Sequence, residues 1–226
     1  MSDYTGKRGT RAYGLRAWIV NLAAGVGLIV GALAGDVAAA QERPKLVVLG
    51  DSLTAGYGLP AEQAFPVRLE AWLKQNGADV QVINAGVSGD TSAGGLARLD
   101  WAIGAPPASY ALVALGANDG LRGLPPPALE QNIDRIVERL KERNVKVLLA
   151  GMYAPRNYGR EYAAEFDGVF GRVARRHNVP LYPFFLDGVA ADPGLNQGDG
   201  IHPNARGVEV MVERIGPLVR RLLAGG

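Results

Sequence analysis

The feature that most constrains the fold is a regular alternation of short apolar runs with longer amphipathic segments. The runs are typical of strands buried on both faces of a sheet. The segments between them carry apolar residues at helical spacing. This alternation predicts an α/β domain in which helices cover both faces of a parallel sheet. The expected strands are residues 45–49, 80–83, 110–115, 145–150 and 180–185, and the expected helices are residues 65–75, 91–101, 127–143, 161–177 and 204–223, the last one kinked at Gly216-Pro217.

The first 40 residues differ from the rest and predict a secretory signal peptide. A leader with four Lys/Arg precedes an apolar stretch over residues 17–34, and small residues at 37–40 resemble a cleavage site. The alternative is an uncleaved membrane anchor, but an asparagine and three glycines dilute the apolar stretch. Cleavage near Ala40 leaves residues 41–226 as a single domain.

Composition excludes several kinds of chemistry. The chain has no cysteine, which excludes disulfides, thiolate metal sites, a cysteine nucleophile and a lipoprotein anchor. Of the 24 Lys/Arg and 22 Asp/Glu residues, residues 1–40 hold four and two, so the remainder carries 20 of each sign. A neutral domain of this kind gives no indication of a nucleic-acid partner.

The scarcity of histidine narrows the search for a catalytic base. Hydrolysis at a serine usually needs an imidazole to take the hydroxyl proton, and the chain has two histidines. His177 follows two arginines and is expected at the polar end of a helix. His202 lies three residues after Asp199, a spacing that lets the carboxylate reach the nearer ring nitrogen and fix the tautomer. The alternative is a helix N-cap with an exposed histidine.

The candidate nucleophile is Ser52, in the sequence Gly50-Asp51-Ser52-Leu53 that follows the first expected strand. Ligands of open parallel sheets bind beyond the carboxyl ends of the strands, which is where this serine falls. Helix capping by a serine or an aspartate is the alternative explanation. The Gly-x-Ser-x-Gly sequence of α/β-hydrolases occurs nowhere in the chain, so a nucleophilic Ser52 implies a different fold.

Acyl transfer also needs hydrogen-bond donors for the developing oxyanion. Gly89 can offer a backbone N–H, and Asn118 can offer its side-chain amide. Each follows an expected strand, although each taken alone is better explained as a turn residue. Asp90 and Asp119 are expected to be turn or cap residues. No set of ligands is spaced for a metal ion.

Taken in chain order, the motifs GDSL, VSGDT, GAND and DGIHP resemble those of the SGNH (GDSL) hydrolase family. The resemblance covers residues 45–222. It implies a flavodoxin-like, three-layer α/β/α sandwich with a five-stranded parallel sheet, and neither a cofactor nor a metal. The implied catalytic triad is Ser52, Asp199 and His202, and the implied oxyanion hole is formed by Ser52, Gly89 and Asn118.

The resemblance further implies a periplasmic, monomeric serine esterase without a stable membrane anchor after cleavage. Its small-molecule or lipid substrates would be aryl esters, acyl thioesters and lysophospholipids. A carbohydrate O-acetyl esterase would have a short, polar acyl site instead, and the complete set of motif residues argues against a non-catalytic acyl-binding protein. Apolar residues near the strand ends are candidates for an acyl groove, with ordinary loop packing as the alternative: Leu121, Leu124, Tyr153, Pro155 and Tyr158.

Overall fold

The computed structural model describes residue 1 and residues 43–225. The predicted signal peptide and its cleavage site, apart from residue 1, therefore lie outside the described residues. Within the described part of the chain, no helix is both long enough and apolar enough to cross a membrane.

A single sheet of five parallel strands organises residues 43–225, in the order β2-β1-β3-β4-β5. This is the strand order of flavodoxin-like folds, so the predicted fold class is confirmed. Leu46, Val47, Val48 and Leu49 of the inner strand β1 have no exposed surface, as expected for a strand covered on both faces. The strands are β1 (Lys45–Gly50), β2 (Gln81–Gly86), β3 (Tyr110–Ala114), β4 (Lys146–Ala150) and β5 (Leu181–Tyr182).

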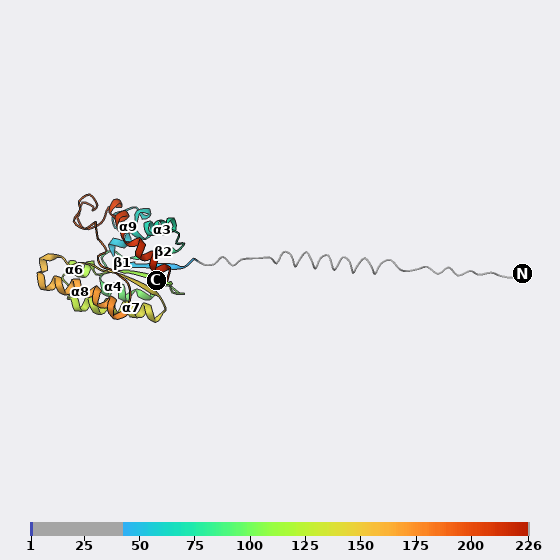
Figure 1. Ribbon diagram of the computed structural model, residues 1–226, viewed down its shortest axis with the longest axis horizontal. Helices are drawn as coiled ribbons and strands as arrows, with labels where there is room; N and C mark the ends of the chain where they lie inside the picture. The colour runs from blue at the N-terminus through green and yellow to red at the C-terminus, as the bar shows by residue number, and fades with distance from the viewer. Residues whose placement is uncertain (2–42, 226) are drawn as a thin grey trace. The chain divides into compact units, whose positions relative to one another are not determined.

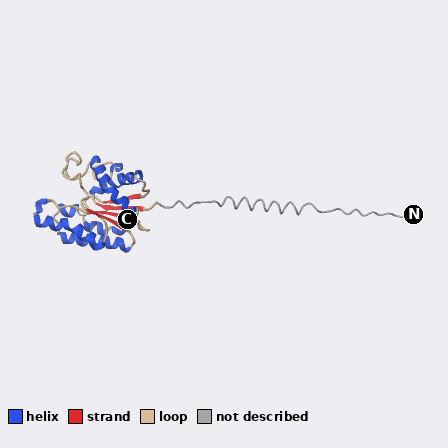
Figure 2. Cartoon of the chain, in the orientation of Figure 1, coloured by secondary structure: helices blue, strands red, loops and turns tan. Residues whose placement is uncertain are grey.

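Helices form a layer on each face of the sheet, as the ribbon and the cartoon show (Figures 1 and 2). One layer contains α3 (Phe65–Gln75) and α9 (Ala205–Leu223), which pack against each other. The opposite layer contains α4 (Ser92–Ala97), α7 (Pro126–Glu142) and α8 (Arg160–His177). The shorter elements are α2 (Ser52–Ala55), α5 (Leu99–Ile103), α6 (Ala117–Leu121) and the 3-10 helices η1 (Ala61–Gln63) and η2 (Arg156–Tyr158).

Two elements differ from the sequence-based expectation. The helix expected over residues 91–101 is divided at Arg98 into α4 and α5. The strand expected over residues 180–185 is only two residues long. After Tyr182 the chain leaves the regular ladder, because the Gly151 carbonyl oxygen accepts from the Phe185 N–H and not from that of Phe184. The last helix continues through Pro217 as one element.

Candidate active site

The turn that follows β1 places Ser52 beyond the carboxyl end of the sheet. The close packing of this turn requires glycine at position 50. A Cβ there would lie 2.4 Å from Thr54 Oγ1 and 3.0 Å from the Ala114 carbonyl oxygen. Asp51 caps the short helix α2, because its Oδ1 accepts a hydrogen bond from the Leu53 N–H at 3.0 Å. The expectation that Asp51 or Ser52 caps a helix is therefore correct for Asp51.

Ser52, His202 and Asp199 form a continuous hydrogen-bonded chain. Ser52 Oγ lies 2.9 Å from His202 Nε2, and His202 Nδ1 lies 2.6 Å from Asp199 Oδ2. The serine and the histidine are 150 residues apart in the sequence, so this contact depends on the whole fold. The arrangement lets the imidazole take a proton from the hydroxyl while the carboxylate fixes its tautomer.

Asp199 is held in its charged form by its own loop. Its Oδ1 accepts hydrogen bonds from the N–H groups of His202 and Ile201, both at 3.0 Å. The His202 N–H, the His202 ring and the Ile201 N–H, in that order, lower the pKa of Asp199 to about 2. The carboxylate is therefore ionised at every pH at which an imidazole titrates.

The side-chain amide of Gln197 joins the loops that carry the nucleophile and the base. Its Nε2 donates to the carbonyl oxygen of Tyr57 at 2.8 Å and to that of Pro203 at 3.0 Å. The Gln197 N–H also donates to the His202 carbonyl oxygen at 2.7 Å. These bonds constrain the position of His202 relative to Ser52.

Of the two predicted oxyanion-hole residues, Asn118 contacts both the loop that carries Gly89 and the turn that carries Ser52. Gly89 has φ of +84°, in the left-handed region that favours glycine. Asn118, in α6, donates from Nδ2 to the Asp90 carbonyl oxygen at 2.9 Å, and this nitrogen lies 3.5 Å from Asp51 Oδ2. The fold thus brings the Asn118 amide beside both the Gly89 loop and the Asp51-Ser52 turn.

Asp51 is also a buried acid, a property that its sequence motif did not predict. Its side chain is 1% exposed, and burial raises its pKa to about 6, against the opposing effect of the hydrogen bond from Leu53. The raised pKa reflects the exclusion of water from this carboxyl group, which belongs to the residue that precedes Ser52.

Arg98 is a site residue that the sequence reading missed. Its guanidinium donates to Asp90 Oδ2 at 2.6 Å, to the Ala85 carbonyl oxygen at 2.7 Å and to the Gly50 carbonyl oxygen at 2.9 Å. One side chain therefore ties together the ends of β1 and β2 and the loop after Gly89. The sequence did offer one indication of a buried role for Arg98, because it is the only charged residue among the small and apolar residues of SAGGLARL.

The residues Asp90 and Asp119, expected as turn or cap residues, do more than that. Asp90 forms the ion pair with Arg98 described above. Asp119 is 2% exposed, and its carboxylate accepts from the Ser92 N–H at 2.8 Å and from Ser92 Oγ at 2.6 Å. These bonds attach α6, and with it Asn118, to the start of α4.

Four of the five predicted acyl-groove residues gather beside α6. The Tyr158 hydroxyl donates to the Leu121 carbonyl oxygen at 2.9 Å, and Tyr162 donates to that of Leu124 at 2.9 Å. A Cβ at Gly120 would lie 3.3 Å from Pro155 Cδ, which places this proline against the same helix. Whether these residues hold an acyl chain stays a prediction.

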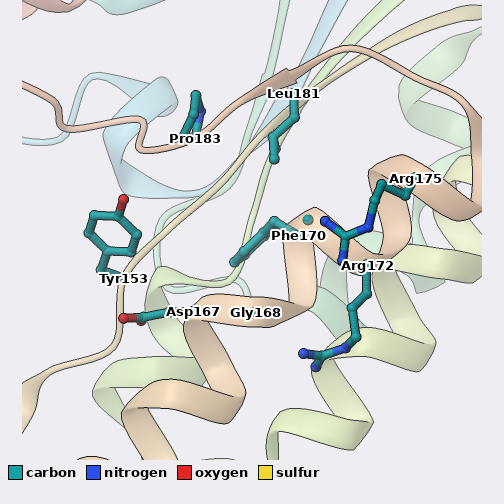
Figure 3. Close-up of a pocket in the computed structure, with 9 residues that line it drawn as sticks. Tyr153, Asp167, Gly168, Phe170, Arg172, Arg175, Leu181 and Pro183 are labelled. Atoms are coloured by element: carbon teal, nitrogen blue, oxygen red, sulfur yellow. The ribbon is translucent and has the colours of Figure 1, made fainter.

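Tyr153 faces a different part of the surface. Its ring stacks on that of Phe184, with centroids 4.5 Å apart. It also lines a hollow of about 420 Å³ between α8 and β5, where Figure 3 shows it opposite Leu181 and Arg175. No residue of the Ser52-His202-Asp199 chain lines this hollow.

The other histidine, His177, lies at a helix end and pairs with an aspartate. His177 ends α8, as predicted, and its Nε2 lies 2.8 Å from Asp134 Oδ1 on α7. Over residue 1 and residues 43–225, no group of three or more His, Asp and Glu side chains is arranged to hold a metal ion. His202 is therefore the histidine placed to act on a serine.

A sequence profile of the GDSL-like lipase/acylhydrolase family matches residues 48–210, a span that includes Ser52, Asp199 and His202. The chain belongs to this family. The predicted resemblance to SGNH (GDSL) hydrolases is thus confirmed, and the protein is a hydrolase of the GDSL type.

Curated relatives of this GDSL hydrolase are named as esterases. Esterase TesA of Pseudomonas aeruginosa is 41% identical over 178 residues, covering 79% of this chain and 89% of the relative. The arylesterase of Vibrio mimicus is 41% identical over 166 residues, covering 74% and 83%. Thioesterase 1/protease 1/lysophospholipase L1 of Escherichia coli K12 is 40% identical over 179 residues, covering 77% and 84%.

Solved structures agree with the fold of this GDSL hydrolase. The crystal structure of TesA superposes with a TM-score of 0.75 at 40% sequence identity, over 79% of this chain and 99% of that one. The fold built on the five-stranded parallel sheet is therefore one that this chain shares with TesA.

Proposed function

We propose that this protein is a serine esterase that hydrolyses acyl esters and thioesters through a covalent acyl-enzyme. The observation that carries the proposal is the hydrogen-bonded chain from Ser52 Oγ through His202 to Asp199, with distances of 2.9 and 2.6 Å. Nucleophile, base and orienting carboxylate within hydrogen-bond reach of one another are what acyl transfer requires.

The first half of the reaction acylates Ser52. As Ser52 Oγ bonds to the substrate carbonyl carbon, its proton passes to His202 Nε2. The tetrahedral intermediate then collapses, the bond to the leaving oxygen or sulfur breaks, and the proton on Nε2 moves to that leaving atom. In the second half, water takes the place of the alcohol, so that the carboxylic acid is released and Ser52 regains its proton.

The remaining residues stabilise charge during these steps. Asp199 orients His202 and supports the imidazolium that forms transiently. The backbone N–H groups of Ser52 and Gly89 and the amide of Asn118 donate to the oxyanion. Removing one such donor typically lowers the rate on the order of 10²- to 10³-fold.

The proposed substrates are aryl esters, acyl thioesters and lysophospholipids. The names of the relatives, arylesterase and thioesterase 1/protease 1/lysophospholipase L1, support this range. The cluster of Leu121, Leu124, Pro155 and Tyr158 beside α6 is the proposed acyl groove. We also propose export to the periplasm, on the basis of the leader sequence in residues 1–40.

A p-nitrophenyl ester series of increasing acyl length tests the proposal. We expect turnover to extend beyond acetate and the Ser52→Ala variant to lose activity on the order of 10⁵- to 10⁶-fold with an unchanged melting temperature. Ser109→Ala is the matched control. Ser109 is exposed and precedes β3, so it lies at the amino-terminal end of the strands, whereas Ser52 lies at their carboxyl end.

The other outcomes separate the alternatives. Turnover by Ser52→Ala at the wild-type rate would refute the nucleophile assignment. Turnover restricted to acetate would favour a carbohydrate O-acetyl esterase. Binding of a fatty acid without turnover of any ester would favour an acyl-binding protein.

A further inference from the structure

Tyr57 is an exposed aromatic residue in contact with His202. The two ring centroids are 4.5 Å apart and the ring planes are inclined by 35°. Tyr57 is 53% exposed, although an aromatic ring gains most by burial. The triad mechanism assigns this ring no role, so its place beside the base needs another explanation.

The backbone holds the Tyr57 ring beside the site from two directions. The Tyr57 N–H donates to the Ser52 carbonyl oxygen at 3.2 Å, and the Tyr57 carbonyl oxygen accepts from Gln197. Gly56, which precedes it, has φ of +86°, and a Cβ there would lie 2.7 Å from Ala64 Cβ. The backbone of Tyr57 is therefore fixed to the turn of Ser52 and to the loop of His202, and its ring lies against His202.

Proton transfer determines where the leaving group lies. His202 Nε2 returns its proton to the leaving atom, which places that atom within about 3 Å of Nε2. In the tetrahedral intermediate, the carbon bonded to Ser52 Oγ also carries the oxyanion, which points toward Gly89 and Asn118. The acyl chain and the leaving atom occupy its other two bonds. The substituent on the leaving atom therefore extends from the edge of the imidazole, next to the exposed ring of Tyr57.

We propose that Tyr57 is a specificity-determining residue, whose ring forms an aromatic surface for the leaving group and favours aromatic alcohols and thiols. The inference rests on the proposed triad, because the triad sets the position of the leaving atom. Aromatic pairs in offset or edge-to-face contact stabilise each other beyond what their buried area provides. Selection should therefore distinguish an aromatic ring from a saturated ring of similar size.

A matched pair of acetate esters isolates this effect. Benzyl acetate and cyclohexylmethyl acetate share the acyl group and a primary alkoxide leaving atom, and differ in the aromaticity of the ring. We expect Tyr57→Leu to lower the ratio of kcat/KM for benzyl over cyclohexylmethyl acetate about threefold to tenfold. Tyr57→Phe should preserve the ratio, because it keeps the ring and removes only the hydroxyl.

Two controls accompany this measurement. Trp101→Leu removes an aromatic residue that is 77% exposed on α5, next to Asp100, which pairs with Arg139 near the end of α7. This variant should leave the ratio unchanged. The acyl-length preference of Tyr57→Leu on p-nitrophenyl esters should also match the wild type, because the acyl chain occupies a different bond of the tetrahedral carbon.

Each outcome decides the matter. An unchanged ratio in Tyr57→Leu would overturn the inference. If kcat/KM falls by the same factor on both esters, the ratio is unchanged and the ring acts only on His202. Ser52→Ala is assayed on the same two esters. If that variant keeps the wild-type rate, the proposed function and this inference both fail. If turnover depends on Ser52 but the ratio does not move, only the inference fails.

Discussion

The two sides of the proposed active site, one assigned to proton transfer and the other to binding the oxyanion, are built in different ways. The proton-transfer side consists of Asp199 and His202, three residues apart in one loop, and the carboxylate bonds to the N–H groups of that same loop. The oxyanion side is assembled from distant segments, with Arg98 joining Gly50, Ala85 and Asp90. A short loop is sufficient for the first side, whereas the second requires the completed sheet.

The same contrast separates two carboxyl groups, that of Asp199 within the proposed triad and that of Asp51 next to Ser52 in the sequence. Hydrogen bonds from its loop lower the pKa of Asp199 to about 2, whereas burial raises the pKa of Asp51 to about 6. The carboxylate that supports an imidazolium has to be charged, and the one that caps the turn at Ser52 does not.

The largest expected effect lies on the proton-transfer side. His202→Ala should lower kcat on the order of 10⁵- to 10⁶-fold, because no other group takes the serine proton. Asp199→Asn should cost roughly ten- to a hundredfold less, because the base remains and only its orientation and charge support are lost. Steady-state kinetics of both variants checks the ranking, and a larger loss in Asp199→Asn would contradict the assigned roles.

The second prediction concerns stability and pH. The folded-state pKa of Asp51 lies above its ordinary value of 3.8, so the folded protein loses stability as the pH rises through about 6. Asp51→Asn keeps the cap and cannot ionise. It should raise the free energy of unfolding at pH 8 by at most about 3 kcal/mol, and by little at pH 4. Urea denaturation at both pH values measures the difference.

Asp199→Asn provides the opposite control in that experiment. The pKa of Asp199 is lowered, so its contribution to stability is complete above about pH 4 and is lost as the pH falls through about 2. The variant should therefore be slightly less stable than the wild type at pH 8. A pH-independent change in Asp51→Asn would show that the buried carboxyl does not titrate as described.

The smallest expected effect tests the assembly of the oxyanion side. Arg98→Gln should lower kcat roughly tenfold with little change in KM, because the Gly89 loop and the Asp90 partner of Asn118 lose their anchor. Arg98→Lys should not restore the rate, since an ammonium cannot reproduce three bonds in the geometry of the guanidinium fork. Arg139→Gln, which removes an ion pair with Asp100, is the matched control. Equal kcat values for Arg98→Gln and the wild type would contradict the anchoring role.

The sequence predicted those parts of the molecule that depend on local pattern. Buried strands follow from apolar runs, and the Asp199-His202 pair follows from a three-residue spacing. The helices α2 and α6 were not predicted, because four or five residues are too few to show a helical period. Pro183, inside the expected fifth strand, could have predicted that β5 lies at the edge of the sheet.

The contacts of Arg98 and the burial of Asp51 could not be predicted in the same way. The carbonyl groups that Arg98 binds are 13 and 48 residues away in the sequence, so they become neighbours only when β1 and β2 pair. The burial of Asp51 likewise results from tertiary packing, and the sequence of the GDSL motif does not show that its aspartate is buried.

The separation of Ser52 and His202 by 150 residues also determines when activity can arise. The serine follows the first strand of the domain, and the histidine precedes the last helix. A chain that is still being synthesised therefore carries Ser52 before His202 is available to contact it. Hydrolysis that depends on this contact can therefore begin only after the last part of the domain has folded onto the first.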